Sequence, residues 1–153
     1  MSNEKLLLLR DELSNSERAA EHLRVSLKRC AGLLQCKSPS LEELERLESL
    51  ASRFARLADL LIQRLLRLID DLELEESGSV LDGIGRAEKR GLVDEAGLLI
   101  TIRELRNVIA HEYAADKMHE IYRAVTQIAP ALIDICVRTN SYSRALLGKY
   151  AST

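Results

Sequence analysis

The chain has 153 residues, of which 46% are apolar and 30% are charged, with seven glycines and two prolines. This length suits one domain with its own core, and the composition excludes a disordered chain and favours long helices. The net charge of -2, the aromatic content of 3% and the absence of tryptophan argue against a generic nucleic-acid binder with a broad basic surface or base-stacking platforms. We therefore expect a single domain spanning residues 1–153.

The cysteines and the N-terminus indicate where the protein works. Cys30, Cys36 and Cys136 are odd in number and follow neither C-x-x-C nor a zinc-ligand spacing, so we expect free thiols in a reducing cytosol. The apolar run at residues 6–9 is far too short for a signal sequence or a membrane span. These features predict a cytoplasmic protein without a membrane partner.

Two long helices are predicted in the first half of the chain. Apolar residues recur at steps of three and four over about residues 3–36, the spacing that keeps one stripe on one helix face. Ser40 and Glu43 then form a capping-box pattern, because each side chain can satisfy an unpaired backbone N–H of the other. The second apolar stripe, over residues 44–72, is wide enough for more than one neighbour, and charged residues such as Asp59 and Arg64 occupy its opposite face.

A loop and a short helix are predicted next. Residues 73–79 are polar and have no apolar period, which indicates a loop after the second helix. A short helix is expected over about residues 80–90, with Ser79 as its cap and Gly91 as a left-handed terminator.

Two further helices complete the predicted fold. Asp94 is expected to cap a helix whose apolar stripe covers residues 98–109, and a closing helix is expected after Asp116 with a kink at Pro130. From about residue 140 the tail is expected to be only partly helical. The fold class is therefore all-α: an antiparallel bundle of about four to five helices, without strands.

Polar side chains gather on the helix that follows Asp94. Arg103, Asn107 and His111 lie at positions i, i+4 and i+8, so they form a row that faces away from the core. Arg106 and His111 are about 140° apart on an ideal helix. The two side chains can converge only if the helix unwinds near its end or if a second copy of the chain supplies one of them.

The segment Arg106-Asn107-Val108-Ile109-Ala110-His111-Glu112-Tyr113 fits the pattern R-x-x-x-x-H-x-Y, with a polar residue directly after the arginine. The pattern and its place near the end of a late helix resemble the HEPN superfamily of ribonucleases. More specifically, the chain resembles the HepT toxins, the helical half of bacterial toxin–antitoxin pairs whose antitoxin is a minimal nucleotidyltransferase. The resemblance covers most of the chain, from the two long helices to the closing helix.

This resemblance implies an activity and a role for each residue of the motif. Arg106 and His111 would be catalytic, Asn107 would support them, and Tyr113 would be the hydroxyl to which the nucleotidyltransferase attaches AMP. Arg103, on the same polar row, is a further candidate for substrate contact. The implied protein is a homodimeric, metal-independent endoribonuclease toxin of a type VII-like pair, which acts on RNA and needs no cofactor.

The residue types also suit metal-free RNA cleavage. An RNA 2'-hydroxyl attacks the adjacent phosphorus once a group with a pKa near 7 removes its proton, and histidine is the side chain with that value. An arginine stays protonated and can neutralise the charge that develops on the phosphoryl oxygens. A second His111, from the other chain of a dimer, could protonate the leaving oxygen.

Other interpretations of the sequence remain open. The chain could be a non-catalytic HEPN-like module that binds a nucleotide or serves as an accessory subunit of a nucleotidyltransferase. It could also be a coiled-coil-like dimerisation protein, although this leaves the Arg-Asn-His-Tyr set unexplained. A metal site is not expected because no histidine has a glutamate three residues before it, and His22 and His119 are expected to face solvent.

Overall fold

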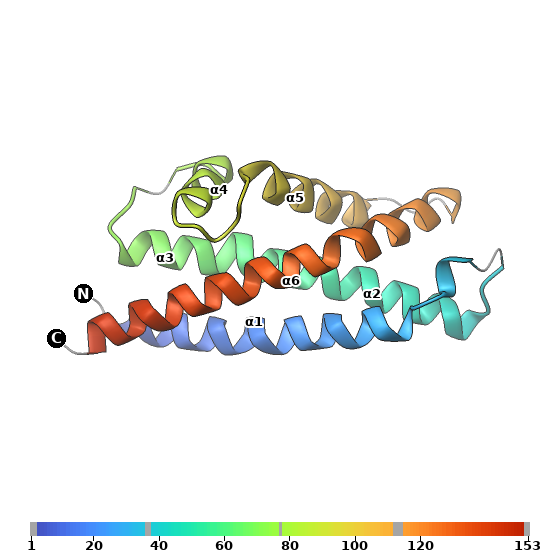
Figure 1. Cartoon of the computed structure of the whole chain (residues 1–153), viewed down its shortest axis with the longest axis horizontal. Coiled ribbons are helices and arrows are strands. Elements are labelled where there is room, and N and C mark those ends of the chain that lie inside the picture. The colour runs from blue at the N-terminus through green and yellow to red at the C-terminus, as the bar shows by residue number, and fades with distance from the viewer. Residues whose placement is uncertain (1–2, 36–37, 77, 112–114, 152–153) are drawn as a thin grey trace.

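Helices make up nearly all of the computed structural model, which describes residues 3–35, 38–76, 78–111 and 115–151 (Figure 1). No strand occurs in these ranges, so the predicted all-α class is confirmed. The elements in chain order are α1 (Asn3–Arg29), the 3₁₀ turn η1 (Leu33–Gln35), α2 (Leu41–Asp59), the π-helical segment η2 (Leu60–Leu65), α3 (Leu66–Leu72), α4 (Val80–Lys89), α5 (Ala96–His111) and α6 (Ala115–Ala151).

The long helices build the bundle, and the short ones cover one side of it. In Figure 1, α6 runs across the bundle from the end of α5 towards the start of α1, and it packs against α1, α2 and α5. Helix α4 lies over α3 and leads into α5. No helix in the described part of the chain is both long enough and apolar enough to cross a membrane.

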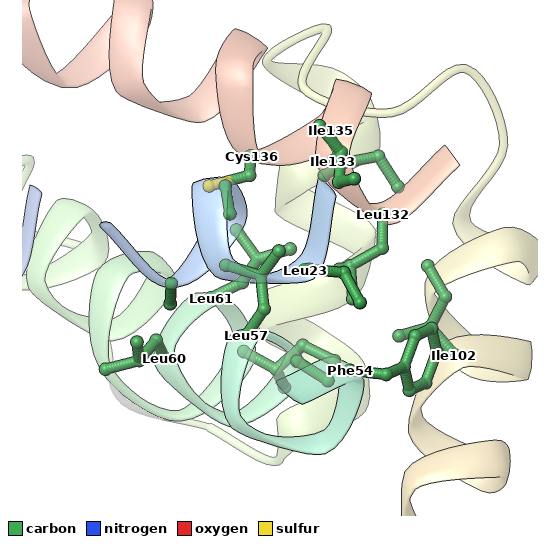
Figure 2. Close-up of a cluster of buried hydrophobic side chains, with 14 of the residues drawn as sticks. Leu23, Phe54, Leu57, Leu60, Leu61, Ile102, Leu132, Ile133, Ile135 and Cys136 are labelled. Atoms are coloured by element: carbon green, nitrogen blue, oxygen red, sulfur yellow. The ribbon is translucent and has the colours of Figure 1, made fainter. Parts of the chain in front are cut away.

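One continuous core joins these helices. Figure 2 shows Leu23 of α1, Phe54 of α2, Ile102 of α5 and Leu132 of α6 among the buried side chains, and all four are 0% exposed. Burying each such side chain stabilises the fold by about 1.5–3 kcal/mol. The core therefore fixes α5, which carries the candidate site, against α2 and α6.

Two of the three predicted helix caps are present. The Ser40 hydroxyl accepts from the Glu43 amide and the Glu43 carboxylate accepts from the Ser40 amide, which confirms the predicted capping box. Ser79 caps α4 in the same way with Asp82 as its partner. Gly91 has a φ of +78°, so the predicted left-handed terminator is confirmed.

The predicted cap at Asp94 is wrong. Helix α5 begins two residues later, at Ala96, and the amide of Ala96 donates to the carboxylate of Glu88 over 2.9 Å. Asp94 instead accepts from Arg138 of α6 over 3.0 Å. A side chain from α4 therefore satisfies an amide at the start of α5, and sequence spacing does not reveal such a long-range cap.

Both ends of the chain also differ from prediction. The first helix ends at Arg29 instead of near residue 36, and Gly32, with a φ of +83°, lies in the turn before η1. Helix α6 continues through Pro130 to Ala151, so the tail after residue 140 is fully helical as far as the described residues reach. Packing of α6 on the core holds this segment, since Leu146 is buried.

The second predicted helix contains a π-helical segment. At its end the amide of Leu66 donates to the carbonyl of Leu61, five residues earlier, in place of the usual four. Leu60, Leu61 and Ile62 are all buried, whereas Gln63 and Arg64 are exposed on the other side. Gln63 and Arg64 in the widened turn therefore point outward, while the segments before and after them are buried.

Candidate functional site

Arg106 is tied to the end of α2. Its Nε donates to Oδ1 of Asp59 over 2.7 Å and its Nη2 donates to Oδ2 over 3.0 Å. This two-point geometry fixes the plane of the guanidinium group. The hydrogen bonds to Asp59 and the negative charge of Asp59 raise the pKa of Arg106, so its positive charge persists at any working pH. Both side chains stay partly exposed, at 34% and 42%.

An open groove of about 390 Å³ lies beside this ion pair. One wall comes from the end of α2 and from η2, and the other comes from α5. The lining residues are Ala58, Asp59, Ile62, Gln63, Arg64, Arg103, Arg106 and Asn107. The structure thus brings Arg103, Arg106 and Asn107, three of the residues singled out in the sequence, to one surface.

The two other arginines of the groove differ in their partners. Arg64 donates through Nη1 to Oε1 of the buried Glu12 over 3.1 Å, although the Arg64 side chain is 61% exposed. Arg103 is half-buried and forms no ion pair within the described ranges of the chain. Both therefore retain N–H donors that can face a ligand in the groove.

His111 is not part of this groove. It is the last residue of α5, it is exposed, and it is absent from the groove lining. Within one chain the structure therefore does not bring His111 to Arg106. Tyr113, the predicted AMP acceptor, lies outside the described residues.

The other histidines and two of the cysteines lie elsewhere, and Cys36 lies outside the described residues. His22 is exposed, as expected, whereas His119 is half-buried with its Nε2 3.5 Å from Nη2 of Arg123. Cys30 and Cys136 are buried free thiols, and burial raises the pKa of both. A raised pKa lowers the thiolate fraction, so neither thiol is suited to act as a nucleophile.

Sequence reasoning did not assign Asp59, Gln63 and Arg64 to the site. Asp59 and Arg64 were recognised only as charges on the outer face of the second helix. Asp59 and Arg106 are 47 positions apart, and their pairing depends on how α5 packs against α2. A π-helical segment cannot be recognised within a broad stripe of leucines, so the spacing of apolar residues does not predict where Gln63 and Arg64 point.

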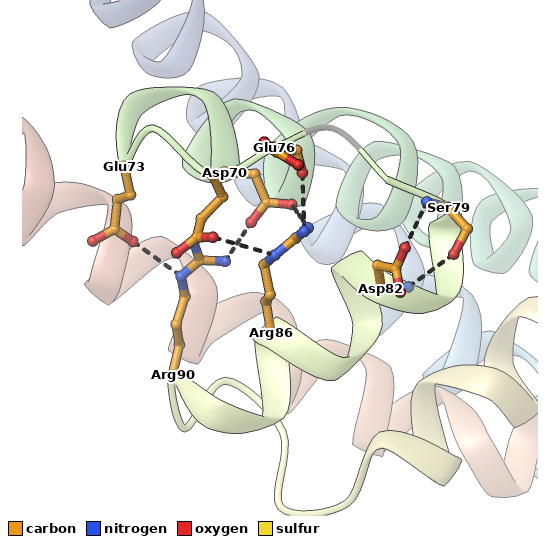
Figure 3. A network of polar contacts seen from close by, with 8 residues as sticks. Asp70, Glu73, Glu76, Ser79, Asp82, Arg86 and Arg90 are labelled. Atoms are coloured by element: carbon orange, nitrogen blue, oxygen red, sulfur yellow. Dashed lines mark hydrogen bonds and ion pairs between the residues drawn. The ribbon is translucent and has the colours of Figure 1, made fainter.

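A second cluster of arginines and carboxylates joins α3 to α4 (Figure 3). Asp70 is 6% exposed and accepts from Nη1 of Arg86 over 3.1 Å and from Nη1 of Arg90 over 2.6 Å. Arg86 also donates through Nη2 to the carbonyl of Glu76 over 2.9 Å. These contacts hold α4 and the preceding loop against α3.

Glu73 extends this cluster to α6. Its Oε1 accepts from Nε of Arg90 over 2.9 Å and from the Tyr142 hydroxyl over 2.5 Å. Burial raises the pKa of Tyr142, and the hydrogen bond to the charged Glu73 raises it further. The cluster joins α3, the end of α4 and α6 through several contacts, which indicates a structural role.

The described residues contain no group of three His, Cys, Asp or Glu side chains arranged to hold a metal ion. No protein-family model matches the chain, and neither a curated protein nor a solved structure matches it. The features of the chain that bear on function are therefore the groove and α5, which carries Arg106 and His111.

Proposed function

We propose that the chain is a metal-independent endoribonuclease of the HEPN type, the toxin of a type VII-like toxin–antitoxin pair. The observation that carries the proposal is the groove in which Arg103, Arg106 and Asn107 lie together, with Arg106 held by Asp59 over 2.7 and 3.0 Å. A fixed arginine in an open polar groove is suited to binding a phosphodiester.

In this proposal Arg106 neutralises charge on the scissile phosphate. Asp59 uses two of the five N–H donors of the guanidinium group, so three remain for phosphate oxygens. Because the group is already oriented, little conformational entropy is lost when the substrate binds. Asn107, one residue further along α5, would donate its amide to the same phosphate or orient the reacting histidine.

His111 would act as the proton-transfer group, and a second copy of the chain would bring it to Arg106. His111 lies five residues after Arg106, which is about 7.5 Å along the helix axis and about 140° around it. A two-fold dimer that pairs the α5 helices would place the His111 of one protomer beside the groove of its partner. One histidine would then take the 2'-hydroxyl proton and the other would protonate the leaving oxygen.

A cleavage assay on purified protein tests this proposal. Arg106→Ala and His111→Ala should each lower the rate of RNA cleavage by at least about 100-fold. EDTA should leave the rate unchanged, and the products should end in 2',3'-cyclic phosphates. His22→Ala is the matched control, because His22 is also exposed but lies on α1. Normal cleavage by both site variants, or loss of cleavage on chelation, would reject the mechanism.

The composite site has its own test. When the inactive Arg106→Ala and His111→Ala proteins are mixed and allowed to exchange protomers, heterodimers should regain cleavage. One cleft of such a heterodimer again contains an intact arginine and an intact histidine, but the second histidine that would protonate the leaving oxygen is missing, so the rate should recover only in part. If the mixture stays inactive while a purification tag carried by only one variant co-purifies the other, the two residues do not act across the interface.

Control of the toxin would pass through Tyr113, two residues after His111. An attached AMP would place a bulky nucleotide and a negative charge close to the catalytic residues, and its phosphate could pair with Arg106. After co-expression with a nucleotidyltransferase partner, mass spectrometry should find AMP on Tyr113 and cleavage should be silenced. Tyr113→Phe should stay active under the same conditions. Silencing of Tyr113→Phe would mean that the partner inhibits by occlusion.

A non-catalytic module is the second candidate, and the position of His111 favours it. His111 is exposed and outside the groove, so a single chain offers a cation for binding without a base for catalysis. Such a module would bind a nucleotide or a nucleotidyltransferase through Arg106. It predicts that Arg106→Ala weakens nucleotide binding, that His111→Ala does not, and that neither protein cleaves RNA.

A further inference from the structure

The π-helical segment shapes one wall of the groove. Gln63 and Arg64 lie within η2 and point away from the buried Leu61 and Leu65. Single π-helical turns inside α-helices are frequent at functional sites because they redirect side chains out of the regular helical pattern. Here these side chains are an amide and a guanidinium group that line the groove together with the polar row of α5, and the guanidinium group of Arg64 also reaches Glu12 of α1.

The charges and donors of the groove favour an anion. The groove has three arginines, at positions 64, 103 and 106. Only two carboxylates contact them among the described residues, Glu12 and Asp59. Arg103 has no ion-pair partner in the part of the chain that the structure describes. The cationic groups are thus only partly neutralised by the protein.

The groove suits a phosphate chain better than a base. Its volume of about 390 Å³ is that of a small-ligand site, and Ala58 and Ile62 are its only apolar lining residues among those described. No aromatic side chain among the described residues lines it, so this part of the chain offers no surface there on which a base could stack. Guanidinium and amide donors bind phosphate oxygens of any nucleotide, which makes such contacts independent of base sequence.

We propose that this groove is a phosphate subsite for single-stranded RNA, in which Gln63 and Arg64 of η2 and Arg103 of α5 bind the phosphodiester next to the one held by Arg106. The subsite deepens the proposed nuclease function and rests on it for the identity of the ligand. It accounts for a local cationic surface on a chain whose net charge is -2. It also predicts affinity without sequence preference and with a strong dependence on salt.

Binding can be measured apart from cleavage. A fluorescein-labelled 2'-O-methyl oligoribonucleotide keeps the phosphodiester charges but lacks the hydroxyl that attacks, so it stays intact. In anisotropy titrations at low salt, Arg64→Gln and Arg103→Gln should each weaken binding about tenfold. The slope of log affinity against log salt should fall by about 0.7 for each lost phosphate contact. Gln63→Ala should have a smaller effect.

Matched controls separate charge from position. Arg18→Gln removes the same charge from an exposed position of α1 that does not line the groove, and it should leave affinity within about twofold. Arg64→Gln leaves the buried Glu12 without its partner, so its melting temperature must be checked. Arg103→Gln breaks no ion pair among the described residues and tests the subsite without that complication.

The outcomes distinguish this inference from the proposed function. The subsite would be overturned if Arg103→Gln and Arg64→Gln bind the oligonucleotide as tightly as the control Arg18→Gln, even if the protein cleaves RNA. It would also be overturned if the unmodified protein does not bind the oligonucleotide at low salt. Weakened binding by the groove variants would support the subsite even if no cleavage is found, and the nuclease proposal alone would then fail. Weakened binding of an acidic peptide, with unchanged RNA binding, would assign the groove to a protein partner instead.

Discussion

Two arginine–aspartate clusters in this protein have the same chemistry and different surroundings. Asp70 is buried and receives two arginines, and one of these, Arg90, is also held by Glu73. Asp59 is 42% exposed and, within the described ranges, receives only Arg106, at the edge of an open groove. In the first cluster the aspartate is buried under its partners, although Asp70 and Arg86 border a smaller pocket of about 190 Å³, whereas the second cluster leaves donors facing solvent.

This difference separates a structural contact from a candidate binding site. A buried carboxylate requires charged or hydrogen-bonding partners, so the arginines that bind it contribute mainly to the fold. A partly exposed pair contributes little to stability, because water competes for both groups. The groove arginines are therefore available to a ligand at small structural cost, and variants of the two aspartates should behave in opposite ways.

The largest expected effect on stability is that of Asp70→Asn. It leaves the guanidinium of Arg90, which is 11% exposed, without its closest charge partner. Loss of one partner of a buried ion pair should lower the free energy of unfolding by about 3 kcal/mol, since Arg90 keeps Glu73. Thermal melting should show a decrease of about 10 °C. A decrease in melting temperature of less than about 2 °C would mean that water screens the ion pairs of this cluster as strongly as it screens the pair between Asp59 and Arg106.

Tyr142→Phe should have an intermediate effect that depends on pH. Burial and the hydrogen bond to Glu73 raise the pKa of Tyr142 in the folded protein, so the folded state retains the proton longer than the unfolded state. This stabilisation is fully present below the unfolded pKa, about 10, and is lost as the pH rises through the folded value. The variant should be about 1 kcal/mol less stable at neutral pH.

The difference between the Tyr142→Phe variant and the unmodified protein should therefore shrink above about pH 10. Urea unfolding at pH 7, 9 and 10.5 measures it. A constant difference over this range would show that the hydroxyl of Tyr142 does not couple its ionisation to folding.

Asp59→Asn should have the smallest effect on stability and a clear effect on activity. The free energy of unfolding should change by less than about 1 kcal/mol, because the pair with Arg106 is partly exposed. RNA cleavage should slow about tenfold through kcat, since the guanidinium group loses the carboxylate that orients it. Restoration of the rate by Asp59→Glu would support a positioning role.

Two results would contradict this view of Asp59. Faster cleavage by Asp59→Asn would mean that the carboxylate masks Arg106 from the substrate. A loss of stability as large as that of Asp70→Asn would mean that the two clusters serve the same structural purpose.

Several features of the fold could be predicted because they depend on neighbours in sequence. The Ser40 and Ser79 caps and the turn at Gly91 each involve residues no more than a few positions apart. The cap at Asp94 was mispredicted because the satisfying group, Glu88, comes from the preceding helix. Sequence patterns that act over a few residues thus located the helices. They failed at the start of α5, where a side chain from another helix satisfies the backbone amide.

The sequence by itself determined the helical class, the approximate helix positions and the polar row of α5, because apolar periodicity and capping chemistry act over a few residues. Tertiary structure alone decided that Asp59 meets Arg106 and that Gln63 and Arg64 of η2 line the same groove as Arg103 of α5. It also decided that Asp70 is buried while Asp59 stays at a groove. Two aspartates on the same predicted helix look alike in sequence, and they differ only because packing against α4 excludes water from one and packing against α5 does not.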